Sequence, residues 1–176
     1  MIKFSSLIVL ILILTKTSYS SNLIVLDIEE IINSNKQYEE ILIKINNNQD
    51  KSSNLLKKDE LELENLFEEI EDSKLLLDEN EINRLIEEYN IKSNKFNEVV
   101  ESFNLHYQEQ IVEIRKFIIQ EIIVLAEKYA KDNNIDIILD SSSYLIASNK
   151  INITGIIREK LNNIDLKLEF KDFEKN

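Results

Sequence analysis

Residues 56–103 read LKKDELELENLFEEIEDSKLLLDENEINRLIEEYNIKSNKFNEVVESF and contain two series of apolar residues spaced seven apart. The members of the two series are Leu56, Leu63, Ile70 and Leu77, then Ile82, Tyr89, Phe96 and Phe103. An apolar residue every seventh position on a charged surface is typical of helices that pair as a coiled coil. A polar stretch, 78–81, separates the series. The sequence therefore predicts two long helices joined by a short turn, which form an antiparallel hairpin.

The helical pattern extends outward from this stretch in both directions. We assign 29–132 to a helical arm, with its tip near 77–82. Arms of about 50 residues would reach about 75 Å at 1.5 Å per residue, so the arm is too thin to be globular. An ordinary helical bundle with a bent hairpin is the alternative. Residues 46–54 contain no apolar side chain and either form a solvated helical segment or divide the first helix in two.

Short strands are expected at the two ends of the arm. Apolar runs predict strands at Leu23–Leu26, Ile135–Leu139 and Tyr144–Ala147, and the strict alternation of Ile164–Phe170 predicts a further one. Asn152 is expected to cap a short helix between the last two strands. Because a hairpin returns the chain to its starting point, 21–28 and 133–176 should meet in one small β-body.

A body of so few strands would bury little apolar surface alone, so we expect several copies to share a core. The residues expected to form this oligomerisation body are Ile24, Leu26, Ile137, Leu139, Tyr144 and Ile146. The fold class predicted is α+β, with a long antiparallel helical hairpin projecting from a small β-body.

The composition limits the partners and the means of stabilisation. The chain has 176 residues, a formal net charge of −12, no Cys, no Pro and one Gly. Disulfides are therefore excluded, and the negative charge disfavours nucleic acid, whose binding requires Lys and Arg at the phosphates. The same negative charge disfavours direct binding to an anionic lipid surface.

The first twenty residues have the layout of a secretory signal. Lys3 precedes the apolar run Leu7–Leu14, and the small residues Ser18 and Ser20 occupy the −3 and −1 positions of a cleavage site. Cleavage after about Ser20 would remove two lysines and no acid, which takes the net charge from −12 to −14. Retention of this segment as an anchor is the alternative.

No pattern indicates catalysis. His106 is the only histidine and has no Cys near it, so no structural zinc site, metal or other cofactor is expected. Phosphate-binding glycine loops and nucleophile motifs are lacking as well. We therefore predict a protein that is not an enzyme.

The chain resembles the Skp or OmpH family of periplasmic chaperones. The resemblance rests on NLIVLDI at residues 22–28, on NIDIILDSSSYLIA at 134–147 and on NITGIIREKL at 152–161. It implies a jellyfish-like homotrimer whose arms surround a cavity for unfolded outer-membrane proteins, which are held without ATP. Family members known best are basic, and this acidic chain departs from them, so direct binding to lipopolysaccharide is not expected of it. The segment after Leu161 extends past the family pattern.

Within that resemblance, exposed leucines on the arm are the expected client-binding residues. They are Leu75, Leu76 and Leu77 at the tip, with Leu61 and Leu105 off the helix–helix seam. Packing of these leucines against neighbouring arms is the alternative. The competing function is a structural or scaffolding coiled-coil protein of the cell envelope with one defined folded partner.

Overall fold

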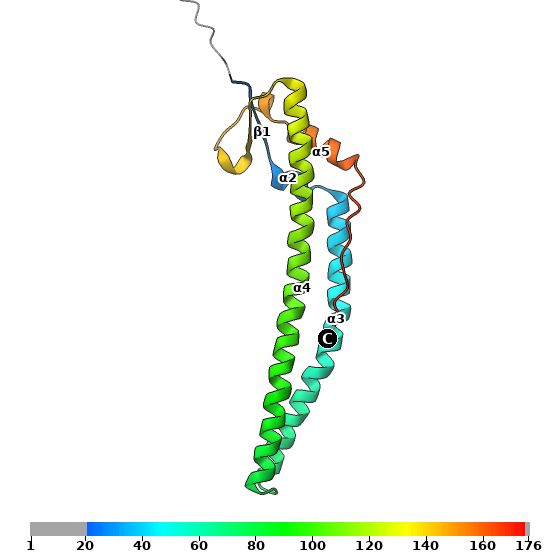
Figure 1. The fold of residues 1–176 in the computed structure, drawn as a ribbon, viewed down its shortest axis with the longest axis vertical. Helices are drawn as coiled ribbons and strands as arrows, with labels where there is room; N and C mark the ends of the chain where they lie inside the picture. Colours follow the sequence, from blue (N-terminus) through cyan, green and yellow to red (C-terminus); the bar gives the residue numbers. More distant parts are fainter. Residues whose placement is uncertain (1–20, 175–176) are drawn as a thin grey trace, which may run out of the picture.

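A computed structural model describes residues 21–174, and the predicted signal segment lies outside this range. Two long helices, α3 (Lys36–Ser73) and α4 (Glu79–Asn133), run side by side and form the arm. A small body made of the remaining elements sits at the end of the arm far from the turn (Figure 1). The predicted hairpin and body are confirmed. None of the helices in 21–174 combines the length and apolar character needed to span a membrane.

The body contains one pair of parallel strands. β1 (Leu23–Leu26) pairs with β2 (Ile137–Asp140) in a register that places Leu23 opposite Ile137. Parallel strands need a long crossover, and here the whole arm provides it. The first predicted strand is confirmed, whereas the second begins two residues later than expected. Asn134 ends α4 in the left-handed conformation with φ of 52°, which asparagine tolerates at this position.

The first arm helix breaks near its start and not at its polar segment. A short helix, α2 (Ile28–Asn33), ends before Asn35, which begins α3 by accepting a hydrogen bond from the amide of Tyr38 at 2.9 Å. Residues 46–54 are helical throughout. Within them, Ser52 is buried and accepts a hydrogen bond from the hydroxyl of Tyr107 on α4 at 3.2 Å. The polar segment remains helical because part of it faces the partner helix.

The seam of the arm changes from the body to the tip. Near the body, α4 buries Tyr107, Ile114, Ile118, Ile122 and Ala126. Toward the tip, the residues of the heptad series on α4, such as Tyr89 and Phe96, are only half-buried. On α3, Leu66 and Ile70 are still buried near the tip, but there only the two helices face each other. The body and the C-terminal residues add further elements around the arm at its other end. Most of the buried core therefore lies at the body end.

Two predicted strands are wrong. Residues 144–147 form an irregular loop between two single-turn 3₁₀ helices, η1 (Ser141–Ser143) and η2 (Asn149–Ile151). Residues 164–170 are extended, but they form no strand and lie along the arm, not in the body (Figure 1). Lys167 interrupts this segment with φ of 47°. The alternation of 164–170 correctly predicted that one face of this segment is buried, but that face packs on the arm helices and not in a sheet.

The last helix, α5 (Thr154–Asn162), packs against α2 and α4. Asn152 accepts a hydrogen bond from the amide of Thr154 at 2.9 Å, but it is not the N-cap expected of it. Ile153 occupies the N-cap position and makes no side-chain capping bond, so the helix begins one residue later than predicted. Ile153, Ile157 and Leu161 are buried, whereas Ile156 is exposed.

Candidate functional site

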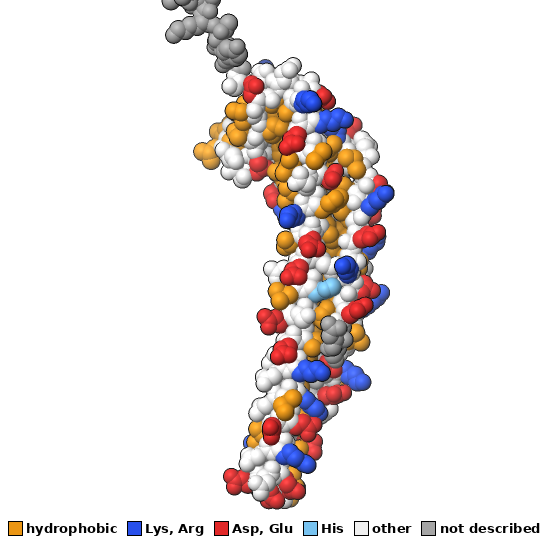
Figure 2. Space-filling model, in the orientation of Figure 1, with side chains coloured by type: hydrophobic (Ala, Val, Ile, Leu, Met, Phe, Trp, Pro, Cys, Tyr) orange, Lys and Arg blue, Asp and Glu red, His pale blue; other side chains and the backbone are white. Residues whose placement is uncertain are grey.

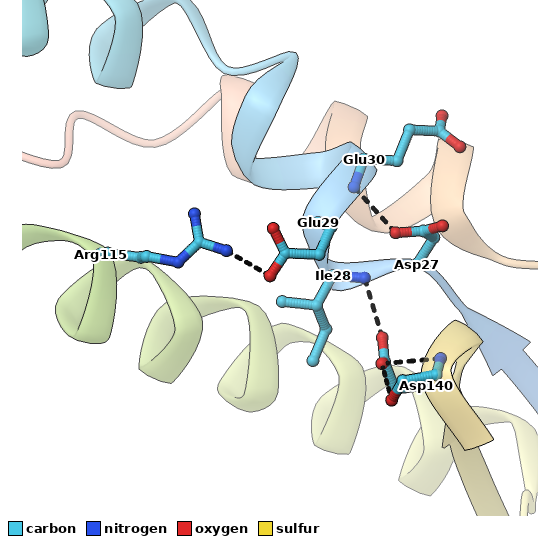
Figure 3. Close-up of polar contacts among 7 residues, drawn as sticks. Asp27, Ile28, Glu29, Glu30, Arg115 and Asp140 are labelled. Atoms are coloured by element: carbon cyan, nitrogen blue, oxygen red, sulfur yellow. Dashed lines mark hydrogen bonds and ion pairs between the residues drawn. The ribbon is translucent and has the colours of Figure 1, made fainter. Parts of the chain in front are cut away.

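The junction between body and arm is held by side chains that bond distant backbone amides. Asp140, at the end of β2, accepts from the amide of Ile28 at 3.1 Å (Figure 3). Thr154 of α5 accepts from the amide of Asp27 at 2.9 Å. Both amides lie where β1 leads into α2, one on the N-cap residue of α2 and one on its first residue. These bonds connect the start of the chain to elements that follow the arm.

The hydrogen bonds at Asp140 change its acidity. Burial acts most strongly on this carboxyl group and favours the neutral form, but the hydroxyl of Ser142 and the amides of Ile28, Ser142 and Ser141 favour the anion. Together these donors hold the pKa of Asp140 below its usual value. The carboxylate is therefore the form that the body stabilises.

Ion pairs connect α2 to its neighbours. Arg115 of α4 bonds Glu29, and the two side chains face each other across the gap between α4 and α2 (Figure 3). Hydrogen bonding to Glu29 raises the pKa of Arg115 above its usual value. Arg158 of α5 reaches Glu30 at 2.8 Å. All four side chains are partly or largely solvated, so each pair contributes little to stability.

The six residues predicted for oligomerisation differ in their exposure within the single chain. Ile24 and Leu26 are buried within this one chain, and Leu139 and Tyr144 are half-buried. Ile137 is exposed on β2, and Ile146 is 92% exposed in the loop beside a fully exposed Leu145. Within the described chain, β2 has a hydrogen-bonded neighbour on one side only, which is β1. The body thus presents a strand edge and an apolar loop.

The predicted tip leucines form the turn of the hairpin. Residues 74–77 connect α3 to α4, so these leucines lie in the turn and not in a helix. Leu75 is 95% exposed and Leu76 is 84% exposed, whereas Leu77 is 39% exposed. The turn is nonetheless ordered by its own backbone, because the amides of Leu76 and Leu77 donate to the carbonyl of Ser73 at 2.9 and 3.0 Å. Three leucines are therefore presented at the end of a defined loop.

The other two predicted leucines lie elsewhere on the arm. Leu61 and Leu105 are both about half exposed. Leu61 lies twelve residues before the end of α3, about 18 Å from the turn, and Leu105 is about 39 Å from it along α4. The structure does not bring the five leucines together. Other exposed apolar side chains accompany them along both helices, including Ile43, Leu55, Ile91 and Val112.

Sequence reasoning missed one surface, which lies between α3 and α4 near the body. Residues 163–174, hereafter the C-terminal strap, cover it (Figure 1). Leu166 of the strap is 4% exposed, and Ile164, Leu168, Phe170 and Phe173 pack against the same core. The alternation of apolar and charged residues in 164–171 indicated that one face of this segment is buried. It did not indicate that the surface covering that face is the pair of arm helices.

His106 contacts the strap. Its Nε2 lies 2.9 Å from the carbonyl oxygen of Lys171, and its ring packs edge-on against Phe173 with centroids 5.6 Å apart. The histidine is therefore a seam residue of the arm and strap. Among the described residues, no group of three or more His, Cys, Asp or Glu side chains is arranged to hold a metal ion.

Comparisons with known proteins agree with this architecture. The model of the family described as outer membrane protein (OmpH-like) matches residues 22–161. A solved structure, that of a candidate outer membrane chaperone (OmpH-like) from Caulobacter crescentus CB15, is similar with a TM-score of 0.65. Its sequence identity is 12%, over 91% of this chain and 95% of that chain. A sequence comparison with curated proteins gives no match.

Proposed function

Because this chain belongs to the family of OmpH-like outer membrane proteins, we propose that it is a chaperone for unfolded outer-membrane proteins. It holds them in the periplasm without ATP and prevents their aggregation. The observation that carries this proposal is the exposure of apolar side chains along an ordered arm, above all at Leu75 and Leu76. Exposed apolar groups on a folded surface mark sites that bind other apolar groups.

The acidic surface fits a holding function. Charged side chains are distributed along the whole visible face of the arm, with apolar ones between them (Figure 2). Each isolated apolar contact is weak. A client would therefore be held by many such contacts along the arm, and no single contact would fix its conformation. The net charge of −12 keeps the chaperone and its complexes soluble. An acidic chaperone surface repels acidic clients, so this chain does not capture them by attraction between opposite charges.

We further propose that the working form is a homotrimer whose copies join through the body, that is, through 21–28 and 133–162. The exposed edge of β2 and the loop residues Leu145 and Ile146 support this arrangement. Strand edges and apolar loops left open on a single chain are usually covered by a partner. Three joined bodies would place three arms around one space, with the tip leucines at its rim.

Suppression of aggregation tests the proposal. A urea-unfolded outer-membrane β-barrel protein is diluted into buffer with and without the protein lacking 1–20, and light scattering is followed. Stoichiometric amounts of the trimer should abolish most of the scattering, and ATP should have no effect. Unchanged scattering, together with stoichiometric recovery of one folded partner from the cell envelope, would instead support the scaffolding function.

A further inference from the structure

Two glutamine side chains hold the main chain of the C-terminal strap. Gln37 of α3 donates to the carbonyl oxygen of Ile164 at 2.7 Å and accepts from the amide of Leu166 at 2.9 Å. Gln110 of α4 donates to the carbonyl oxygen of Lys171 at 2.8 Å and accepts from the amide of the same residue. Each glutamine thus supplies one donor and one acceptor, as a neighbouring strand would. Such bonds do not depend on the side chains of the bound segment.

The side chains of the strap are sorted by polarity. Its apolar residues face the arm, and its charged residues Asp165, Lys167, Glu169 and Lys171 are exposed. At its far end, Phe173 packs edge-on against Phe103 of α4, with ring centroids 5.2 Å apart. The surface between the helices therefore recognises an extended segment in which apolar and polar residues alternate.

This surface continues past the strap toward the tip. Asn48 and His106 contact the last residues of the strap. Eleven residues further along each helix, about three turns away and so on the same face, are Asp59 and Lys95. Both line a cleft between α3 and α4 that also includes Leu63, Phe96 and Val99. We call the whole surface, from Gln37 to this cleft, the arm groove. The strap covers only its upper part.

Membrane-spanning strands of outer-membrane β-barrels carry the same pattern, about ten residues of alternating apolar and polar character. We propose that the arm groove binds such segments of unfolded β-barrel proteins in an extended form. The C-terminal strap is its intramolecular occupant, and client segments displace it. The class of client named here rests on the proposed function.

An intramolecular occupant weakens client binding, because the apparent affinity of the groove equals its intrinsic affinity multiplied by the fraction of molecules in which the strap is released. If the strap is bound in nine of ten molecules, loosening it strengthens client binding about tenfold. A client segment would then be retained only if it binds the groove more tightly than the strap does, or if the client binds the grooves of several arms at once. The strap would also shield the upper groove while no client is present.

A peptide that alternates Leu and Phe with Asp and Lys over ten residues tests the groove directly. Its fluorescence anisotropy is measured with the wild-type protein and with Leu166→Asp/Phe173→Asp, which loosens the strap. The peptide should bind more tightly to the variant, by the factor by which the fraction of molecules with a released strap rises. A peptide of the same composition with its apolar residues grouped at one end is the control, and it should bind more weakly to both proteins.

A covalent lock gives the opposite test. The chain has no native Cys, so Asn48→Cys/Asp172→Cys can be bridged specifically by a short bis-maleimide. The side chains of these two residues are 2.8 Å apart at their hydrogen-bonded atoms. Bridging should weaken peptide binding at least tenfold relative to the same variant left unbridged. Equal affinities in the loosened, bridged and unbridged proteins would overturn the proposal and leave the strap as a structural brace.

Amide exchange in the wild-type protein avoids variants that fold poorly. Saturation with an unfolded β-barrel protein should accelerate exchange at the amides of Leu166 and Lys171, and slower or unchanged exchange would contradict displacement. Equal suppression of aggregation by bridged and unbridged proteins would remove the groove proposal and keep the chaperone function. Failure of every form to suppress aggregation would remove the proposed function, and with it the client class.

Discussion

The carboxylate of Asp140 and the backbone amide of Ile28 form a hydrogen bond of 3.1 Å across 112 residues of sequence. One partner ends the second strand, and the other begins the first helix after β1. The bond therefore exists only when the complete arm has folded and returned. It makes Asp140 a sensitive position for testing how the body is assembled.

Asp140→Asn should destabilise the protein by about 1 kcal/mol at neutral pH, because hydrogen bonds to a charged acceptor are stronger than those to a neutral one. Folding lowers the pKa of this carboxyl group, so the wild-type advantage is complete above its usual value of 3.8. As the pH falls below that value and through the lowered pKa, the advantage should disappear. Urea unfolding at one protein concentration, from pH 7 to pH 3, measures both effects. A constant difference across this range would contradict the prediction.

Thr154→Val should cost about 1–2 kcal/mol, since the amide of Asp27 would lose its acceptor without a change in side-chain volume. Thr154 is buried, so water cannot easily replace the hydroxyl. Thr154→Ser keeps the hydroxyl and serves as the matched control. Denaturant midpoints of the three proteins should order as wild type, then Thr154→Ser, then Thr154→Val.

Leu75→Ser/Leu76→Ser should reduce the suppression of client aggregation several-fold without loss of stability. Both side chains are almost fully exposed, so their removal should change the free energy of unfolding by less than about 0.5 kcal/mol. Asn83→Ser/Asn90→Ser, at exposed polar positions of the same arm, is the control and should act as the wild type. Full activity of the tip variant would exclude the turn as a client contact.

Leu145→Ser/Ile146→Ser should convert the proposed trimer to smaller species. Both residues are exposed in the single chain, and their burial between copies would contribute about 1.5–3 kcal/mol per side chain. Mass measured by light scattering should fall from about three chains toward one. Ile43→Ser removes an exposed apolar residue of the arm instead and should leave the mass unchanged. A trimer that survives the loop variant would place the interface elsewhere.

Local patterns predicted elements well where one face of a segment is buried over several turns. The heptad series led to both long helices, and the apolar run Leu23–Leu26 led to β1. The start of α3 at Asn35 was missed, although Ser34-Asn35 carries the residue types preferred at a helix start. The tip leucines were expected to be exposed, and they are, but they lie in the turn at 74–77 and not on a helix.

Sequence patterns predicted the wrong element where the surface on which a segment packs decides its conformation. Tyr144–Ala147 and Ile164–Phe170 have strand-like sequences, yet neither forms a strand in the described chain. An apolar or alternating segment requires a surface to pack on, and its sequence does not specify whether that surface is a strand, a helix pair or another copy. The client-binding and oligomerisation residues share this limit, because each depends on a partner outside the chain.

The sequence by itself determined the two helices of the hairpin and the existence of a strand at each end, because helix periodicity and apolar runs are local properties. The turn lies at 74–77 and not at the predicted polar stretch 78–81, whose last three residues are helical. Only the tertiary structure decided that 46–54 stays helical, that Asp140 bonds the amide of Ile28, and that the C-terminal strap lies on the arm. Each of these depends on contacts between residues far apart in the chain, whose geometry no local pattern encodes.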